Sequence, residues 1–294
     1  MAYQISHLSR YAFSEPVTIS HNLAWLHPRN TSHQTVLHAQ WAIQPTPAMI
    51  LERRDVYDNR VHYFEVLEPH RTLSVEYVSQ VEVTPPPPLP ATCSPSWEEV
   101  RTLLNTAQDT EKLWAQQFLL DSPLVRRTPA LARYAAPSFP ARRPFFAGVL
   151  DLMGRIHDDF EYMPNITTVS TPLEEILKKR QGVCQDFAHI AIGALRSLGL
   201  AARYVSGYLE TLPPPGEPRM IGADASHAWF ATLFPGVGWI DLDPTNNVLP
   251  RDQHITLAWG RDYTDVPPLK GVVFGGGRQP LLEVQVDVMR LGQH

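Results

Sequence analysis

The sequence predicts an α+β protein in which an antiparallel β-sandwich precedes a core made of a buried helix packed on an antiparallel sheet. Three observations lead to this prediction. Apolar and polar residues alternate up to about residue 83, a run of prolines follows at 85–88, and apolar residues then recur at helical spacing. With 294 residues, the chain is long enough for one large domain or two ordinary ones.

The N-terminal region, residues 1–84, has the alternation of β-strands, with no helical segment between them. Asp58-Asn59 fits a hairpin turn between two of these strands. The region is rich in histidine, but its histidines lack the close spacing of zinc ligands, so we expect them on strand faces. The alternating segments are 3–8, 36–43, 60–66 and 73–83.

A stiff, extended linker is predicted for residues 85–96, because consecutive prolines cannot form a central strand or a helix interior. Ser96 then fits a helix N-cap, with Glu99 three residues later as in a capping box. The second domain is therefore expected over 97–294. Its tail has little regular pattern until an alternating segment at 282–289, which we expect to return to the N-terminal domain.

Composition and charge argue against several classes of protein. The net charge of −5 provides no basic surface for nucleic acid, and no apolar run approaches the roughly 18 residues that span a bilayer. The first residues lack the charged and apolar pattern of a signal peptide. Two cysteines, Cys93 and Cys184, do not make a disulfide framework. We expect a cytoplasmic protein with no nucleic-acid or membrane partner, no metal and no cofactor.

A lone cysteine, Cys184, stands at the predicted start of a buried helix. Apolar residues recur at three- and four-residue steps over 183–198, and Gly199 fits the helix end. A thiol in the first turn feels the partial positive charge of unpaired N–H groups, which favours the nucleophilic thiolate. The alternative is a small buried cysteine that only packs.

Two strand-like segments downstream carry a histidine and a carboxylate. His227 lies near the start of 226–233, and Asp243 ends 238–243 after a short turn. Two antiparallel strands can place both side chains at one end of a sheet, against the helix that carries Cys184. This is the arrangement of a nucleophile, a base and an orienting carboxylate.

Three sequence blocks that hold these residues resemble bacterial transglutaminase-like proteins, which are related to cysteine peptidases of the papain-like superfamily. The blocks occur in the order Cys, His, Asp. An N-terminal block and the tail resemble one bacterial branch that has a β domain before the core, so the resemblance covers nearly the whole chain. The blocks are Gly182–Ala188, Ser226–Trp229 and Gly238–Asn246, with Arg10–Pro16, Trp259–Pro268 and Gly275–Gly277 for the bacterial branch.

The resemblance implies a papain-like, transglutaminase-like fold for the second domain. It implies that Cys184 is the nucleophile, that His227 is the general base and acid, and that Asp243 orients the imidazole. Asp241 remains a competing carboxylate because it lies two residues earlier on the same strand face. The Asp-Pro-Thr match at 243–245 favours Asp243.

An oxyanion hole is also required, and the backbone N–H of Cys184 is one natural donor. Tyr162 and Gln185 are candidates for the second donor, although Tyr162 could equally be a core residue. Trp229 and Trp239 are expected to wall the site.

Three other polar residues are interpreted structurally. Asp186, in the helix first turn, is expected to cap or to form a salt bridge. His189 lies off the helix face that carries the thiol. Lys270 and the following glycines fit either a mobile flap or a structural crossover.

The leading functional hypothesis is cysteine-dependent hydrolysis of an amide or isopeptide bond through an acyl-thioester on Cys184, with a peptide, isopeptide or small amide as substrate. Transglutaminase-type transfer to an amine is the alternative. Hydrolysis is favoured because no acidic loop marks a calcium site like that of the animal crosslinking enzymes, an argument by family analogy. Two further hypotheses are a non-catalytic binding protein on the same fold and a metal protein that uses the N-terminal histidines. The oligomeric state is not predicted.

Overall fold

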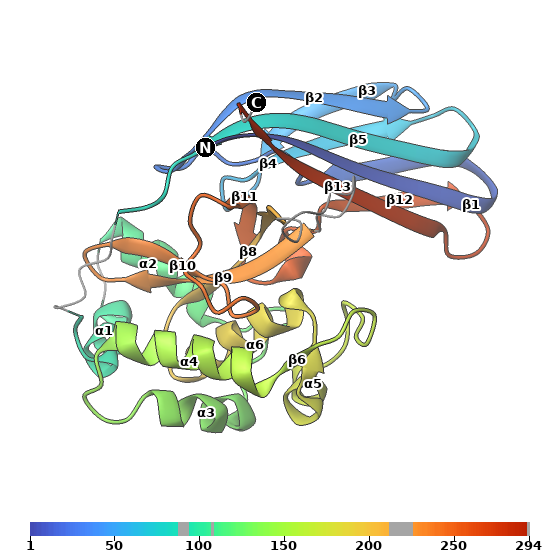
Figure 1. Cartoon of the computed structure of the whole chain (residues 1–294). Helices are drawn as coiled ribbons and strands as arrows, with labels where there is room; N and C mark the ends of the chain where they lie inside the picture. Colours follow the sequence, from blue (N-terminus) through green and yellow to red (C-terminus); the bar gives the residue numbers. More distant parts are fainter. Residues whose placement is uncertain (88–93, 107–108, 212–225, 293–294) are drawn as a thin grey trace, which may run out of the picture.

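The computed structural model describes residues 1–87, 94–106, 109–211 and 226–292, so Cys93 lies outside the described residues. An antiparallel sheet forms one layer of the molecule, and a core of helices and a second sheet lies against it (Figure 1). The first sheet has seven strands. They are β1 (Ala2–Ala24), β2 (Gln34–Gln44), β3 (Met49–Arg54), β4 (Arg60–Val66), β5 (His70–Val83), β12 (Leu269–Gly275) and β13 (Leu281–Leu291).

Strand β1 organises this sheet because it is 23 residues long and is paired along both edges. Its first half, Ala2 to Ala12, pairs with β5 on one side and β13 on the other. Its second half, from Val17, pairs with β4 and β12. Apolar side chains from strands of both halves, such as Phe64 of β4 and Val75 of β5, share one buried cluster.

The predicted α+β fold, with an antiparallel β region before a core of helices and sheet, is confirmed, and the strands of the β region form one continuous sheet. The pairing with β5 is interrupted between Ala12 and Val17, where β1 passes from one half to the other. Alternation of apolar and polar residues is the same whether a strand belongs to one sheet or bridges two halves. The sequence pattern therefore identified strands but not this topology.

The core has six helices among the described residues, a four-stranded antiparallel sheet and a short parallel pair. The helices are α1 (Trp97–Asn105), α2 (Thr110–Gln116), α3 (Pro129–Ala135), α4 (Phe145–Asp159), α5 (Leu173–Lys179) and α6 (Cys184–Ser197), with 3-10 turns at Gln117–Leu119, Ala136–Ser138 and Tyr263–Asp265. The strands, in sheet order, are β10 (Gly238–Leu242), β9 (Ser226–Phe234), β8 (Ala202–Leu209) and β11 (His254–Gly260), and the parallel pair is β6 (Glu161–Tyr162) with β7 (Gln181–Gly182).

Helix α6 lies at the centre of the core, between the other helices and strands β8 and β9 (Figure 1). Its residues from Asp186 to Arg196 are all buried. The charge of Arg196 is compensated by hydrogen bonds to the carbonyl oxygens of Phe118, Ala202 and Arg261. A helix buried on all sides holds the position of its first residue, Cys184, rigidly.

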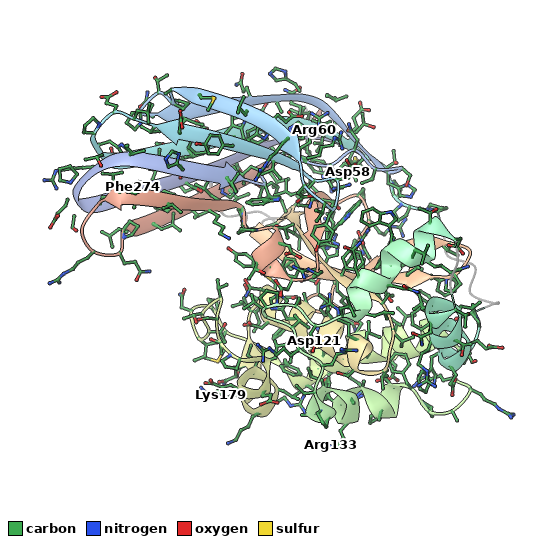
Figure 2. The ribbon with its side chains drawn as sticks, turned by 180° about the vertical axis from the view of Figure 1, so that it is seen from behind. Asp58, Arg60, Asp121, Arg133, Lys179 and Phe274 are labelled. Carbon is green, nitrogen blue, oxygen red and sulfur yellow. The ribbon has the colours of Figure 1, made fainter. Side chains whose placement is uncertain are left out.

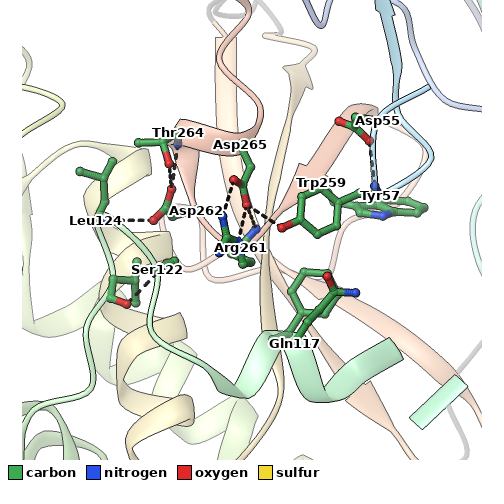
Figure 3. A network of polar contacts seen from close by, with 12 residues as sticks. Asp55, Tyr57, Gln117, Ser122, Leu124, Trp259, Arg261, Asp262, Thr264 and Asp265 are labelled. Carbon is green, nitrogen blue, oxygen red and sulfur yellow. Dashed lines mark hydrogen bonds and ion pairs between the residues drawn. The ribbon is translucent and has the colours of Figure 1, made fainter. Parts of the chain in front are cut away.

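The two layers are joined by a network of polar contacts (Figure 3). The Tyr57 hydroxyl donates to Asp265 at 3.0 Å, and the Arg261 guanidinium pairs with the same carboxylate at 2.9 Å. The Asn59 amide bonds to both the N–H and the C=O of Trp259. In the reverse view, Asp58 lies near this junction, whereas Arg133 and Lys179 lie on the far side of the core (Figure 2).

Local predictions and the structure agree at several points. Ser96 and Glu99 form the reciprocal capping box at the start of α1. The last strand, β13, pairs with β1. The region predicted to be irregular contains two strands, β11 and β12, and the pairing of Lys270 with Leu23 makes that segment a crossover strand. Across the described residues, none of the helices combines the length and apolar composition that crossing a bilayer requires.

Candidate active site

Helix α6 begins at Cys184 and is capped by one of its own carboxylates. Asp186 accepts hydrogen bonds from the backbone N–H of Val183 at 2.9 Å and from the Thr167 hydroxyl at 2.6 Å. Gly182 gives this carboxylate room, because a Cβ there would lie 2.8 Å from the Asp186 Oδ2. Asp186 is thus a cap, as the sequence indicated, and its burial raises the pKa of its carboxyl group.

His227 and Asp243 meet at one end of the core sheet. The Nε2 of His227 lies 2.7 Å from Oδ2 of Asp243, and Asp243 is fully buried. Its other oxygen, Oδ1, accepts hydrogen bonds from the backbone N–H groups of Thr245 and Asn246, at 2.9 and 3.2 Å. The turn that follows β10 therefore fixes the carboxylate. Because Nε2 faces Asp243, the remaining ring nitrogen, Nδ1, is left for another partner.

The Cys184 thiol acts on the imidazole as well, through the pKa of His227. Burial by itself lowers the pKa of His227, but hydrogen bonds with Asp243 and with the Cys184 thiol outweigh burial and raise this pKa to about 10. Burial raises the pKa of Asp243, but hydrogen bonds from His227 and His254 hold it well below its usual range. The arrangement favours a protonated ring between an ionised carboxylate and the sulfur.

The competing carboxylate, Asp241, does not contact His227. It pairs across the strands with Ala231, and its charge interacts with Arg203. Asp243, beyond the end of β10, is the carboxylate that hydrogen bonds to the imidazole. Of the two carboxylates left open by periodicity, the structure thus brings Asp243 to His227.

Two residues of this cluster were missed by sequence reasoning. Nε2 of His254, the first residue of β11, lies 3.1 Å from Asp243 Oδ2, and the Asn246 side-chain amide donates to the same oxygen at 2.7 Å. The only sequence signal for Asn246 was its place in the block that ends at 246. His254 had no signal, because its strand was not predicted.

Two imidazoles and one carboxylate are also a donor set that binds zinc. The possible ligand atoms of His227, Asp243 and His254 lie within 4.8 Å of one another. Within the part of the chain that the structure describes, these three residues form the group that could hold a metal ion. The described histidines of the N-terminal region form no comparable group. Direct hydrogen bonds already satisfy the Asp243 carboxylate, so the geometry by itself does not require a metal.

The other predicted site residues are divided between two places. Tyr162 is half exposed and lies edge-on to Phe187. Burial raises the pKa of the Tyr162 hydroxyl, and negative charge on the Cys184 sulfur raises it further. Gln185 has no hydrogen-bond partner among the described residues. Trp229 is buried beside His227, with 6.0 Å between ring centroids. Trp239 instead lines a separate pocket on the other side of His254.

His189 is structural, as the sequence indicated: its Nε2 accepts a hydrogen bond from the backbone N–H of Tyr263 at 3.2 Å. Burial lowers the pKa of His189 to about 4, so the ring is neutral at pH 7 and suits this acceptor role.

Two family models match separate parts of this chain. Residues 3–82 match the bacterial transglutaminase-like N-terminal region, and residues 135–244 match the transglutaminase-like superfamily. The chain belongs to the transglutaminase-like superfamily. The match to the superfamily core contains Cys184, His227 and Asp243 but ends before His254.

Relatives of this transglutaminase-like protein span its full length. An uncharacterized protein of Mycobacterium tuberculosis is 43% identical over 294 residues, which cover 98% of this chain and 92% of the relative. An uncharacterized protein of Mycobacterium leprae is 32% identical and covers 98% of each chain. The crystal structure of a candidate cysteine protease from Cytophaga hutchinsonii shares the fold, with a TM-score of 0.76, 22% identity, and coverage of 100% of this chain and 92% of that one.

Proposed function

We propose that this transglutaminase-like protein hydrolyses an amide or isopeptide bond through an acyl-thioester on Cys184. The observation that carries the proposal is the 2.7 Å contact of His227 Nε2 with Asp243, which leaves Nδ1 of the same ring for the thiol at the start of α6. A thiolate stabilised by an imidazolium is the reactive form of a catalytic cysteine.

The proposed reaction has two steps. In the first, the Cys184 sulfur attacks the substrate carbonyl, the C–N bond breaks, and the His227 imidazolium gives its proton to the departing amine. In the second, the neutral imidazole takes a proton from water, whose oxygen attacks the thioester. The C–S bond breaks, which releases a carboxylate and restores the Cys184–His227 pair. Asp243 holds the ring in the orientation that both steps need.

Negative charge on the carbonyl oxygen needs hydrogen-bond donors in each step. We assign the backbone N–H of Cys184 as one donor, because the first N–H groups of a helix have no partner within the helix. The Tyr162 hydroxyl is our choice for the second, because Tyr162 lies close enough to Cys184 to feel its charge. Gln185, the neighbour of Cys184 with a free amide, is the alternative.

Acyl transfer to an amine is the second candidate function. A protein-glutamine gamma-glutamyltransferase of Pseudomonas aeruginosa is 30% identical over 127 residues, but these cover 41% of this chain and only 19% of that enzyme. The same thioester serves both reactions, and only the second nucleophile differs. We favour water as the second nucleophile by family analogy, because the sequence has no acidic loop like the calcium site of the animal crosslinking enzymes.

A peptide, an isopeptide or a small amide is the proposed partner, and we propose no role for nucleic acid, a membrane or a cofactor. We propose a cytoplasmic location, where reducing conditions keep the thiol free. Cys184 is a free cysteine in the structure.

The deciding experiment is a screen of peptide and isopeptide amides, with and without an added primary amine, on wild type and Cys184→Ala. We expect turnover by wild type only, with release of a carboxylic acid even when the amine is present. An amide product with the added amine would establish transfer instead.

Labelling with iodoacetamide provides a test that needs no substrate. We expect Cys184 to react far faster than Cys93 near pH 7. Equal labelling of both cysteines, together with no turnover of any amide, would favour a binding protein without catalysis.

A further inference from the structure

A pocket lined in part by His254 lies between the N-terminal region and the core sheet. Its volume is about 590 Å³, which is in the range of small-molecule sites. Residues 31–34, 83–84 and 86–87 form one wall, and strands β8, β10 and β11 form the other. Neither Cys184 nor His227 lines it, so it is separate from the proposed catalytic cleft.

The pocket is lined by a buried arginine, Arg203, that forms no hydrogen-bonded ion pair among the described residues. The guanidinium of Arg203 lies between the rings of Trp239 and Trp259, with 4.3 and 3.8 Å from Cζ to the ring centroids. Arg203 is 8% exposed, and its Nε is buried without a hydrogen-bond partner. Stacking on two indoles satisfies the faces of the guanidinium but not its N–H donors, which lie in the ring plane. A carboxylate that entered the pocket would satisfy these in-plane donors.

Asp241 provides the opposite charge at a distance. Arg203 lies opposite Ala231 on the next strand, and Ala231 lies opposite Asp241 on the one after. Two strand spacings place the two Cα atoms roughly 10 Å apart. The two charges act on each other through space without a hydrogen bond. A ligand between them would meet a donor of bidentate hydrogen bonds on one side and a carboxylate on the other.

His254 adds a second unpaired polar atom. It is 7% exposed and lines the pocket, and its Nδ1 has no partner. Asp243 is ionised and can only accept, so the Nε2 of His254 carries the proton that faces it. The Nδ1 atom of His254 is therefore left for a polar group of a ligand in the pocket.

The walls are fixed before any ligand enters. The Asn59 side chain holds the backbone of Trp259 at 2.9 and 3.0 Å, and the Arg29 guanidinium lies 3.6 Å from the Trp259 ring centroid. The Gln34 amide bonds to both backbone groups of Thr256. Trp259 lies beside the interdomain network (Figure 3). Pre-organised walls lower the entropic cost of binding.

We propose that this interdomain pocket binds a free hydrophobic α-amino acid. The ligand carboxylate is placed at Arg203 and its ammonium between Asp241 and the Nδ1 of His254. An inorganic dianion fits the pocket less well, because Asp241 would repel it. The lining is mixed, with polar residues such as Arg251, but it also includes Val83, Ile240 and Leu249, whose aliphatic side chains suit an apolar ligand side chain.

Calorimetric titration of the full-length protein with L-leucine and L-phenylalanine tests the proposal without any turnover. We expect at least one of them to bind with a Kd below about 1 mM. Isopentylamine, which lacks the carboxylate of leucine, and N-acetyl-L-leucine, which lacks the ammonium, should each bind at least tenfold more weakly, as should inorganic phosphate. No binding of either amino acid up to about 10 mM, or equal binding of phosphate, would overturn the proposal.

Variants assign the two ends of the ligand. Arg203→Met, which keeps the length of the side chain, should weaken L-leucine binding at least tenfold. Asp241→Asn should abolish the preference for L-leucine over N-acetyl-L-leucine. Arg101→Met is the matched control, because Arg101 also stacks on a tryptophan, Trp97, away from the pocket. If Arg203→Met does not fold, the comparison of ligands on wild type still decides, and unchanged binding by a folded Arg203→Met would contradict the site.

Discussion

Replacing Asp243 by asparagine should abolish activity while leaving the protein folded. One side-chain oxygen can still accept from the backbone N–H groups of Thr245 and Asn246. The new amide replaces Oδ2, and its two hydrogens would face Nε2 of His227 and Nε2 of His254. Both rings can adapt by placing their proton on Nδ1. His227 then directs an N–H at the Cys184 sulfur and can no longer accept its proton.

The magnitude follows from these contacts. A base held in the wrong tautomer costs about 10⁴-fold in rate, or about 5.4 kcal/mol in the activation barrier. Stability should fall much less, because only the Asn246 amide, now opposite another amide, loses its acceptor. One unsatisfied buried donor costs about 1–3 kcal/mol.

Two measurements check this prediction on the same samples. The rate of hydrolysis of an amide found in the screen reports on the base, and the rate of Cys184 alkylation at pH 7 reports on the thiolate. Asp241→Asn is the matched control, because it makes the same change two residues earlier without touching His227, and its rates should stay near those of wild type. If Asp243→Asn keeps activity within tenfold of wild type, the assignment of Asp243 as the orienting carboxylate is wrong.

Three further predictions concern the same cluster. Tyr162→Phe should lower kcat by about 10²-fold or more, because one hydrogen-bond donor to the oxyanion is lost, with little change in the free energy of unfolding. An unchanged kcat would mean that Gln185, not Tyr162, is the second donor. The pKa of His227 is raised from 6.5 to about 10, so between these pH values the folded state binds more protons than the unfolded state. The contribution of His227 to stability is therefore present in full below pH 6.5 and is lost as the pH rises through about 10. Urea unfolding should therefore show a steeper loss of stability from pH 7 to 10 in wild type than in His227→Gln, and parallel curves would refute this. Zn²⁺ should inhibit hydrolysis reversibly, because His227, Asp243 and His254 offer three ligand atoms. A chelator should restore activity, and the His254→Gln variant should be inhibited less than wild type. Equal inhibition of both proteins would mean that zinc binds elsewhere.

The sequence was sufficient to predict the elements that carry the three central residues. A cysteine at a helix start and two strands joined by a short turn are local patterns, and local patterns are readable from the chain. The contribution of His254 is not local, because it depends on β11 pairing with β8, and β11 has no clean alternation. The choice between Asp241 and Asp243 also needed coordinates, because it depends on how the chain turns after Leu242.

The second pocket could not have been predicted from the pattern for a similar reason. Arg203 lies in a strand-like segment and Trp259 in the tail, and nothing in their spacing places one on the other. Trp239 was predicted to wall the site, and its stacking with Arg203 was not foreseen. Side-chain environments formed between distant segments depend on tertiary packing.

The pairing of β1 has a consequence for how this protein is made. Strand β1 is hydrogen bonded along one edge to β12 and β13, which are synthesised after the core, and Ala2 lies opposite Leu291 (Figure 1). During synthesis, β1 can pair with β4 and β5 early, but its other edge stays open until β12 and β13 have emerged. Open strand edges are sites of unwanted association between chains. A nascent chain stalled before residue 269 should therefore aggregate more readily than the chain that includes β12 and β13, even though helix α6 and the core sheet are already complete.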